Sequence, residues 1–243
     1  MNRIVYLSIR FLKNILKIIK YERYYLVENL NMCVEVGCMV DLNTNEFKKS
    51  YARILEQERF VEAAIKVAEE QIPDVNLREI LDDKYGKVEE ADIDKIEKEH
   101  GNDIKWLEKN IIIVENRFAY AVKVLVNADE GLLEYLKEEI YKLGQKVDPD
   151  YEDKPVGYLY DVLRNLLLDG GTNEEFNQIM SENFDEVVWT RNRPTTKKYW
   201  TYLDIDFNKY YVPLRRAFIA GVLEKTDVKF STLDETVFVL SRR

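Results

Sequence analysis

The sequence predicts a mainly α-helical protein, in which a helical bundle-like domain over residues 1–150 precedes a small α+β module over residues 151–243. Three observations lead to this fold class. Only 5 prolines and 9 glycines occur in 243 residues, so long helices are permitted. Apolar residues make up 46% of the chain, which is enough for a packed core. Apolar residues recur at helical spacing in the first domain, whereas β-branched and aromatic residues concentrate after residue 185.

The first domain is expected to begin with a basic amphipathic helix over residues 3–20 and to continue with five more helices. Residues 21–43 fit a helix and a strand equally well. The later helices are bounded by residue types that commonly start or stop helices. These are Asn43 and Pro73 for the first, Asp74 or Asn76 and Gly86 for the second, Gly101 at the end of the third, Asn127 at the end of the fourth, and Asp129 and Gly144 for the fifth.

The strongest core signal lies in residues 104–125. The apolar positions there alternate between spacings of three and four residues, at Ile104, Leu107, Ile111, Val114, Phe118, Ala121 and Leu125. This spacing is typical of a helix whose apolar seam packs against other helices. Residues 111–114 are apolar on every side, so we expect this helix to be central.

The second module is expected to follow a linker over residues 144–157, which is rich in proline, glycine and acidic residues. The predicted elements are helices over about 155–168, 172–179 and 213–224, a β-hairpin that pairs residues 187–189 with 199–207 across a basic turn, and a second hairpin that pairs 228–231 with 236–240. A helix followed by a hairpin is also how a winged-helix module ends, so the α+β module is interpreted as winged-helix-like.

Charge is distributed unevenly along the chain, whose formal net charge is -9. Residues 1–20 carry five basic residues and no acid, and residues 186–243 carry eleven basic and seven acidic residues. The segment between them, residues 21–185, holds 20 basic and 38 acidic residues. Such asymmetry indicates different partners for different parts of the chain. The alternative is that the two basic ends pair with the acidic middle within one molecule.

The basic C-terminal module is the sharpest positive signal for function. Lysine and arginine neutralise phosphates, and planar aromatic rings stack on unpaired bases. The residues predicted to contact nucleic acid are Arg191, Arg193, Lys197, Lys198, Trp200, Arg215 and Arg216. We therefore expect a non-catalytic binding or regulatory protein in a larger assembly. Its acidic helical domain would contact a protein partner, and its basic module would contact nucleic acid.

Two alternative functions come from the acidic residues. Asp204 and Asp206 are two residues apart in an expected strand, which would place both carboxylates on one face and allow them to hold a metal ion for phosphoester chemistry. Alternatively, the acidic middle could mimic nucleic acid and occupy the basic groove of a nuclease or defence complex, as some virus-encoded inhibitors do.

The residue inventory excludes several other functions. A structural zinc site usually needs four cysteine or histidine ligands, and Cys33, Cys38 and His100 supply three. His100 is expected to be a solvated residue at a helix end rather than a catalytic base. Neither a phosphate-binding loop nor a dinucleotide-binding fingerprint occurs, so we expect no cofactor and no small-molecule substrate.

The location expected from the sequence is cytoplasmic. Two cysteines in a chain of this length fit a reducing compartment. Arg10 and Lys13 interrupt the apolar run that a secretory signal would need, and no uncharged apolar stretch of membrane-spanning length occurs. The basic helix over residues 3–20 could lie on an anionic membrane, pack in a groove of a protein partner, or form the first helix of the bundle.

Overall fold

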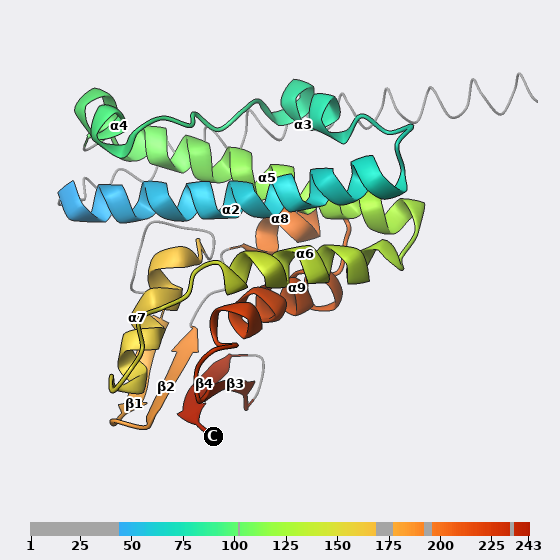
Figure 1. The fold of residues 1–243 in the computed structure, drawn as a ribbon. Coiled ribbons are helices and arrows are strands. Elements are labelled where there is room, and N and C mark those ends of the chain that lie inside the picture. The colour runs from blue at the N-terminus through green and yellow to red at the C-terminus, as the bar shows by residue number, and fades with distance from the viewer. Residues whose placement is uncertain (1–43, 102, 169–176, 192–195, 234–235) are drawn as a thin grey trace, which may run out of the picture. The chain divides into compact units, whose positions relative to one another are not determined.

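The computed structural model describes residues 44–101, 103–168, 177–191, 196–233 and 236–243, all of which belong to one compact unit (Figure 1). The helix expected over residues 3–20, the ambiguous segment 21–43 with its two cysteines, and Arg193 lie outside the described residues. The boundary proposed near residue 150 stays a prediction.

The described residues form eight helices and a small antiparallel sheet, which confirms the mainly helical fold class. The helices are α2 (Thr44–Gln71), α3 (Leu77–Tyr85), α4 (Ile93–His100), α5 (Ile104–Ala128), α6 (Leu132–Gln145), α7 (Val156–Leu166), α8 (Lys197–Tyr202) and α9 (Phe207–Val222). The strands are β1 (Asn177–Glu182), β2 (Glu186–Arg191), β3 (Val228–Thr232) and β4 (Val237–Arg242), in the order β1-β2-β4-β3. None of these helices combines the length and the hydropathy that crossing a membrane requires.

Short polar side chains fix where several helices begin. The side chains of Asn76, Asp92 and Asp103 accept hydrogen bonds from backbone N–H groups in the first turns of α3, α4 and α5. A helix start leaves such N–H groups without partners inside the helix, so a cap of this kind stabilises it by about 1 kcal/mol. Gly86 ends α3 with φ 81°, a left-handed conformation that glycine adopts without strain.

Helices α2 and α5 lie side by side and form the centre of the core (Figure 1). The predicted seam of α5 is buried from Leu107 to Leu125. Phe118, at the middle of this seam, contacts the ring of Phe60 on α2 edge to face and the ring of Trp200 on α8 in the same way. The expectation of a central, wrapped helix is therefore confirmed.

Helices α6 and α9 form a second close pair, in which each contributes a glycine at the crossing. A Cβ atom added to Gly144 would lie 2.2 Å from the carbonyl oxygen of Phe218, and one added to Gly221 would lie 2.2 Å from that of Tyr141. Gly144, which was expected to end its helix, is the last residue but one of α6. Its role is to let the backbone of α9 approach, which larger residues would prevent.

The prediction of a strand over residues 199–207 is wrong. The chain forms α8 there, then a turn in which Asp204 has φ 54°, and then the start of α9. Apolar residues in and after this segment also recur at spacings of three and four, through Trp200, Leu203, Phe207 and Tyr211. Tertiary packing selects the helical pattern, because Trp200 and Leu203 bury their side chains against the core.

The first hairpin also differs from the prediction in its partner strand. Residues 177–182, part of which was expected to be helical, form β1 and pair with β2. The second hairpin is confirmed as β3 and β4. Pro213 was expected to start the last helix, but it lies within α9, and Asp206 caps the start of this helix by accepting from the N–H groups of Asn208 and Lys209.

Candidate anion-binding groove

The residues predicted to bind nucleic acid do not form one surface. Lys197 and Lys198 are exposed on α8, and Arg216 is exposed on α9. Arg191 on β2 and Arg215 on α9 are buried, with 9% and 7% of their surfaces exposed. The structure therefore separates the described members of the predicted set into exposed cations on α8 and α9 and buried residues.

Trp200 is not available for stacking on a base, because its exposed surface is 0%. Its ring lies 5.8 Å from that of Phe118 and 5.4 Å from that of Tyr211 between ring centroids. Such edge-to-face pairs stabilise a core by about 0.5–1.5 kcal/mol beyond the area they bury. The structure therefore places this aromatic ring in the hydrophobic core and not on the surface expected from the sequence.

Arg191 and Arg215 meet at one aromatic ring. Each guanidinium carbon lies 5.6 Å from the centroid of Phe238 on β4. The Nε atom of Arg191 also donates to the side-chain oxygen of Asn177 at 3.4 Å. Cation–π contacts of this kind join α9 to the sheet. The structure thus gives these two arginines an internal role.

A groove of about 360 Å³ lies between the second half of α9 and strand β3. Its lining residues are Arg216, Ala220, Leu223, Val228, Lys229, Phe230, Ser231, Thr232 and Arg243. Of these described lining residues, three are cations, two carry hydroxyl groups, and none is acidic. Of the predicted residues, only Arg216 belongs to this set, and it donates to the hydroxyl of Thr232 at 2.8 Å.

The backbone of β3 adds a hydrogen-bond donor to this groove. Strand β3 is at the edge of the described sheet, with β4 as its neighbour. Leu233 donates to Val237, and Arg243 donates to Asp227, so the odd-numbered residues of β3 bond to β4. In an antiparallel pair the bonded residues alternate, so the N–H group of Phe230 points to the free edge.

Other cations near the C-terminus are paired with carboxylates of the same chain. Lys209 contacts Glu130, and Lys225 contacts Asp148 at 2.9 Å. Arg242 binds Asp227 at 2.8 Å and Asp185 at 2.9 Å. Asp227 directly precedes the groove residue Val228 in sequence, and its carboxylate is already paired with Arg242.

The groove cations differ from these paired residues. Within the part of the chain that the structure describes, Arg216, Lys229 and Arg243 make no ion pair with a carboxylate. Lys198 on α8 is close enough to the Glu108 carboxyl to affect it. Burial raises the pKa of Glu108, and the charges of Lys198 and Lys105 oppose that rise. Among the described residues, the groove therefore brings together three cations that form no ion pair.

The carboxylate pair proposed as an enzymatic centre does not have the expected geometry. Asp206 caps α9 through its Oδ1 atom, and Asp204 lies in the turn before it. Because the two residues are not on one strand, the shared face on which the metal-dependent alternative depends is absent.

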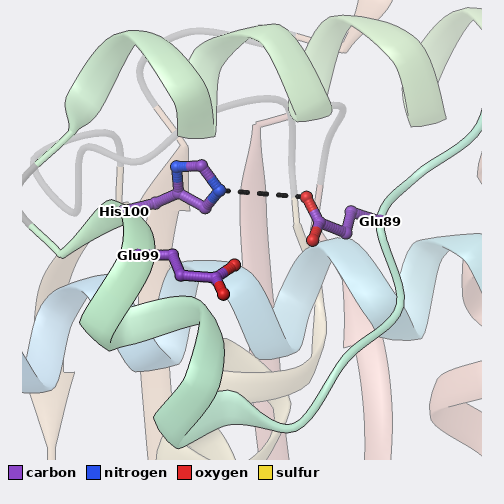
Figure 2. A group of neighbouring side chains, drawn as sticks. All are labelled: Glu89, Glu99 and His100. Atoms are coloured by element: carbon purple, nitrogen blue, oxygen red, sulfur yellow. Dashed lines mark ion pairs between the residues drawn. The ribbon is translucent and has the colours of Figure 1, made fainter.

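Among the described residues, one group of side chains could hold a metal ion. Glu89, Glu99 and His100 each offer one ligand atom, and these atoms lie within 4.8 Å of one another. Figure 2 shows the imidazole and the Glu89 carboxylate facing each other, with the Glu99 carboxylate beside them. His100 does end α4, as expected, but its ring also stacks on Trp106.

Sequence reasoning missed Lys229, Phe230 and Arg243 as groove residues. The hairpin predicted over residues 228–231 and 236–240 did place Lys229 and Phe230 on a strand, which the structure confirms as β3. The sequence does not show which element packs beside the edge of that strand, because α9 reaches β3 only through tertiary packing. No family model, no curated protein and no solved structure matches this chain.

Proposed function

We propose that this protein is a non-catalytic binding protein that holds single-stranded nucleic acid at the groove between α9 and β3. The observation that carries the proposal is the grouping of three cations around a groove whose described lining residues include no acid. Each cation can neutralise a phosphate, and phosphate contacts supply most of the affinity in sequence-independent binding.

The lining also has the other chemical groups that such a ligand would use. Ser231 and Thr232 provide hydroxyl groups, and the N–H group of Phe230 can donate to a phosphate oxygen. The ring of Phe230 is half-buried, so one part of it is open to a base. The order of α9, β3 and β4 also agrees with the winged-helix-like interpretation, which we retain as part of this proposal.

The test is the salt dependence of binding to a fluorescently labelled, single-stranded oligo-dT, measured by fluorescence anisotropy. We expect the variant R216A/K229A/R243A to bind more weakly than the unaltered chain. The slope of log affinity against log salt concentration should fall by about 2, because each lost phosphate contact contributes roughly 0.7 for a single strand.

The matched control is the variant K105A/K197A/K198A, which removes the same charge from exposed positions on α5 and α8. It should keep the salt slope of the unaltered chain. Equal losses in both variants would indicate attraction by the overall charge and would refute a site at the groove. Absence of binding by the unaltered chain at low salt would refute the nucleic-acid proposal itself.

A further inference from the structure

We propose that Glu89, Glu99 and His100 form a binding site for a divalent transition-metal ion, independently of the groove. The Nε2 atom of His100 lies 3.8 Å from a carboxylate oxygen of Glu89, and all three ligand atoms lie within 4.8 Å of one another. Ligands about 2.1 Å from a tetrahedral zinc ion are about 3.4 Å apart, so small side-chain rotations would close the site.

The imidazole is held in place by a rigid aromatic cluster. The His100 ring stacks on Trp106 with centroids 4.5 Å apart and an interplanar angle of 10°. Trp106 in turn packs on Phe47 and Tyr51, whose side chains are completely buried. The direction of Nε2 is therefore fixed before any ion binds, which reduces the ordering that binding requires.

The carboxylate of Glu89 is presented by a loop that the core also anchors. The buried hydroxyl of Tyr51 donates to the backbone oxygen of Glu89 at 2.8 Å and accepts from the N–H group of Ala91 at 3.0 Å. This loop joins α3 to α4, and Glu99 and His100 are the last two residues of α4. Backbone carbonyls at a helix C-terminus favour positive charge, which supports a cation at this position.

The donor set indicates which ions fit. One imidazole and two carboxylates suit Zn²⁺ and its first-row neighbours, whereas Mg²⁺ and Ca²⁺ prefer oxygen ligands alone. Three protein ligands leave a coordination position for water. A bound ion would compete for the Glu99 carboxylate with Lys95, which is exposed and has its ammonium 4.0 Å from Glu99. A bound ion would fasten the loop before α4 to the end of this helix.

The test is a Zn²⁺ titration of the full chain by isothermal titration calorimetry, together with a Ni²⁺ titration followed by tryptophan fluorescence. We expect H100N, E89Q and E99Q each to weaken Zn²⁺ binding by about tenfold or more, since even outer-shell partners of a metal contribute about 10–100-fold. Ni²⁺ should quench Trp106, because this ring lies against the metal ligand, and W106F should lose the quenching but retain the heat of Zn²⁺ binding.

The matched control is E90Q, which alters an exposed acid in the same loop but outside the cluster. It should bind Zn²⁺ like the unaltered chain. All the altered glutamates are exposed, and thermal melts of each variant verify that it is folded. The proposal is overturned if the unaltered chain does not bind Zn²⁺, or if the three ligand variants bind it as tightly as E90Q does.

Discussion

Arginine has opposite surroundings in two regions of this protein. Between α2, α3 and α5, the guanidinium of Arg117 is 3% exposed and binds two carboxylates, Glu58 and Asp82, each at 2.8 Å. At the groove between α9 and β3, Arg216 is exposed and makes one hydrogen bond to a hydroxyl group. The first arginine holds helices together, whereas the second adds to a cluster of like charges.

The comparison teaches that charge summed along a sequence does not give the charge of a surface. The acidic middle of the chain uses part of its carboxylates internally, around Arg117 and in pairs such as Lys66 with Glu139. The basic C-terminal segment likewise uses Lys225 and Arg242 internally. Packing therefore decides which charges remain for a partner, and the three cations of the groove are among them.

The largest effect should follow from Arg117→Met. This change leaves the carboxylate of Glu58 buried without its guanidinium, and removing one partner of a buried pair lowers the free energy of unfolding by about 3–5 kcal/mol. Chemical denaturation of the two chains at pH 8 measures this loss. A loss below about 1 kcal/mol would contradict the structural role of the Arg117 cluster.

The pH dependence of that loss has a definite sign. Burial raises the pKa of Glu58 to about 7 from an ordinary value of 4.5, although Arg117 opposes the shift. A carboxyl with a raised pKa stabilises the fold fully below pH 4.5 and loses this contribution as the pH rises through the folded value. Without Arg117 the pKa of Glu58 should rise further, so R117M should lose more stability at pH 8 than at pH 5.

The double variant E58L/R117M should recover most of the loss, because an apolar pair can replace a buried ion pair.

A smaller effect should follow from Lys66→Ala, which breaks an exposed link between α2 and α6. Lys66 donates to Glu139 at 2.6 Å, and this hydrogen bond lowers the pKa of Glu139. A lowered pKa stabilises the fold above pH 4.5, and the contribution is lost as the pH falls through the folded value. We expect K66A to reduce the free energy of unfolding only slightly at pH 7, because water screens an exposed pair, and by less near pH 3.5. Urea denaturation at both pH values tests this, and an equal loss at both would contradict the assignment.

Much of the helical part of the fold could be predicted because its signals are local. The seam of α5, a cap at Asp74 or Asn76 and the stop at Gly86 act within one helix or its ends. The structure confirms all three, with Asn76 as the cap. Gly144 shows the limit of such signals. A glycine near a helix end is typical of a stop, and only the presence of Gly221 on a distant helix gives it a packing role.

Less of the candidate site could be predicted, because burial decides which charged and aromatic residues remain available. Trp200 and Arg215 have the residue types of a nucleic-acid surface, but tertiary packing buries both. By sequence Lys229 is an ordinary residue of a strand, and only the packing of α9 beside β3 makes it a groove residue. The metal-ligand cluster likewise joins Glu89 to His100 through a loop whose path depends on the buried hydroxyl of Tyr51.

The smallest effect on stability is expected at the groove, and it sharpens the comparison most. Exposed cations without a carboxylate partner contribute little to folding, so R216A/K229A/R243A should change the free energy of unfolding by no more than about 0.5 kcal/mol. Three like charges around one groove also repel one another, so the variant should be slightly more stable at low salt than the unaltered chain. Salt shortens the range of this repulsion, and the difference should vanish at high salt. Thermal unfolding at both salt concentrations measures it. A loss above about 1 kcal/mol would mean that these cations hold α9 on β3, as Arg117 holds its helices, and the contrast between the two regions would disappear.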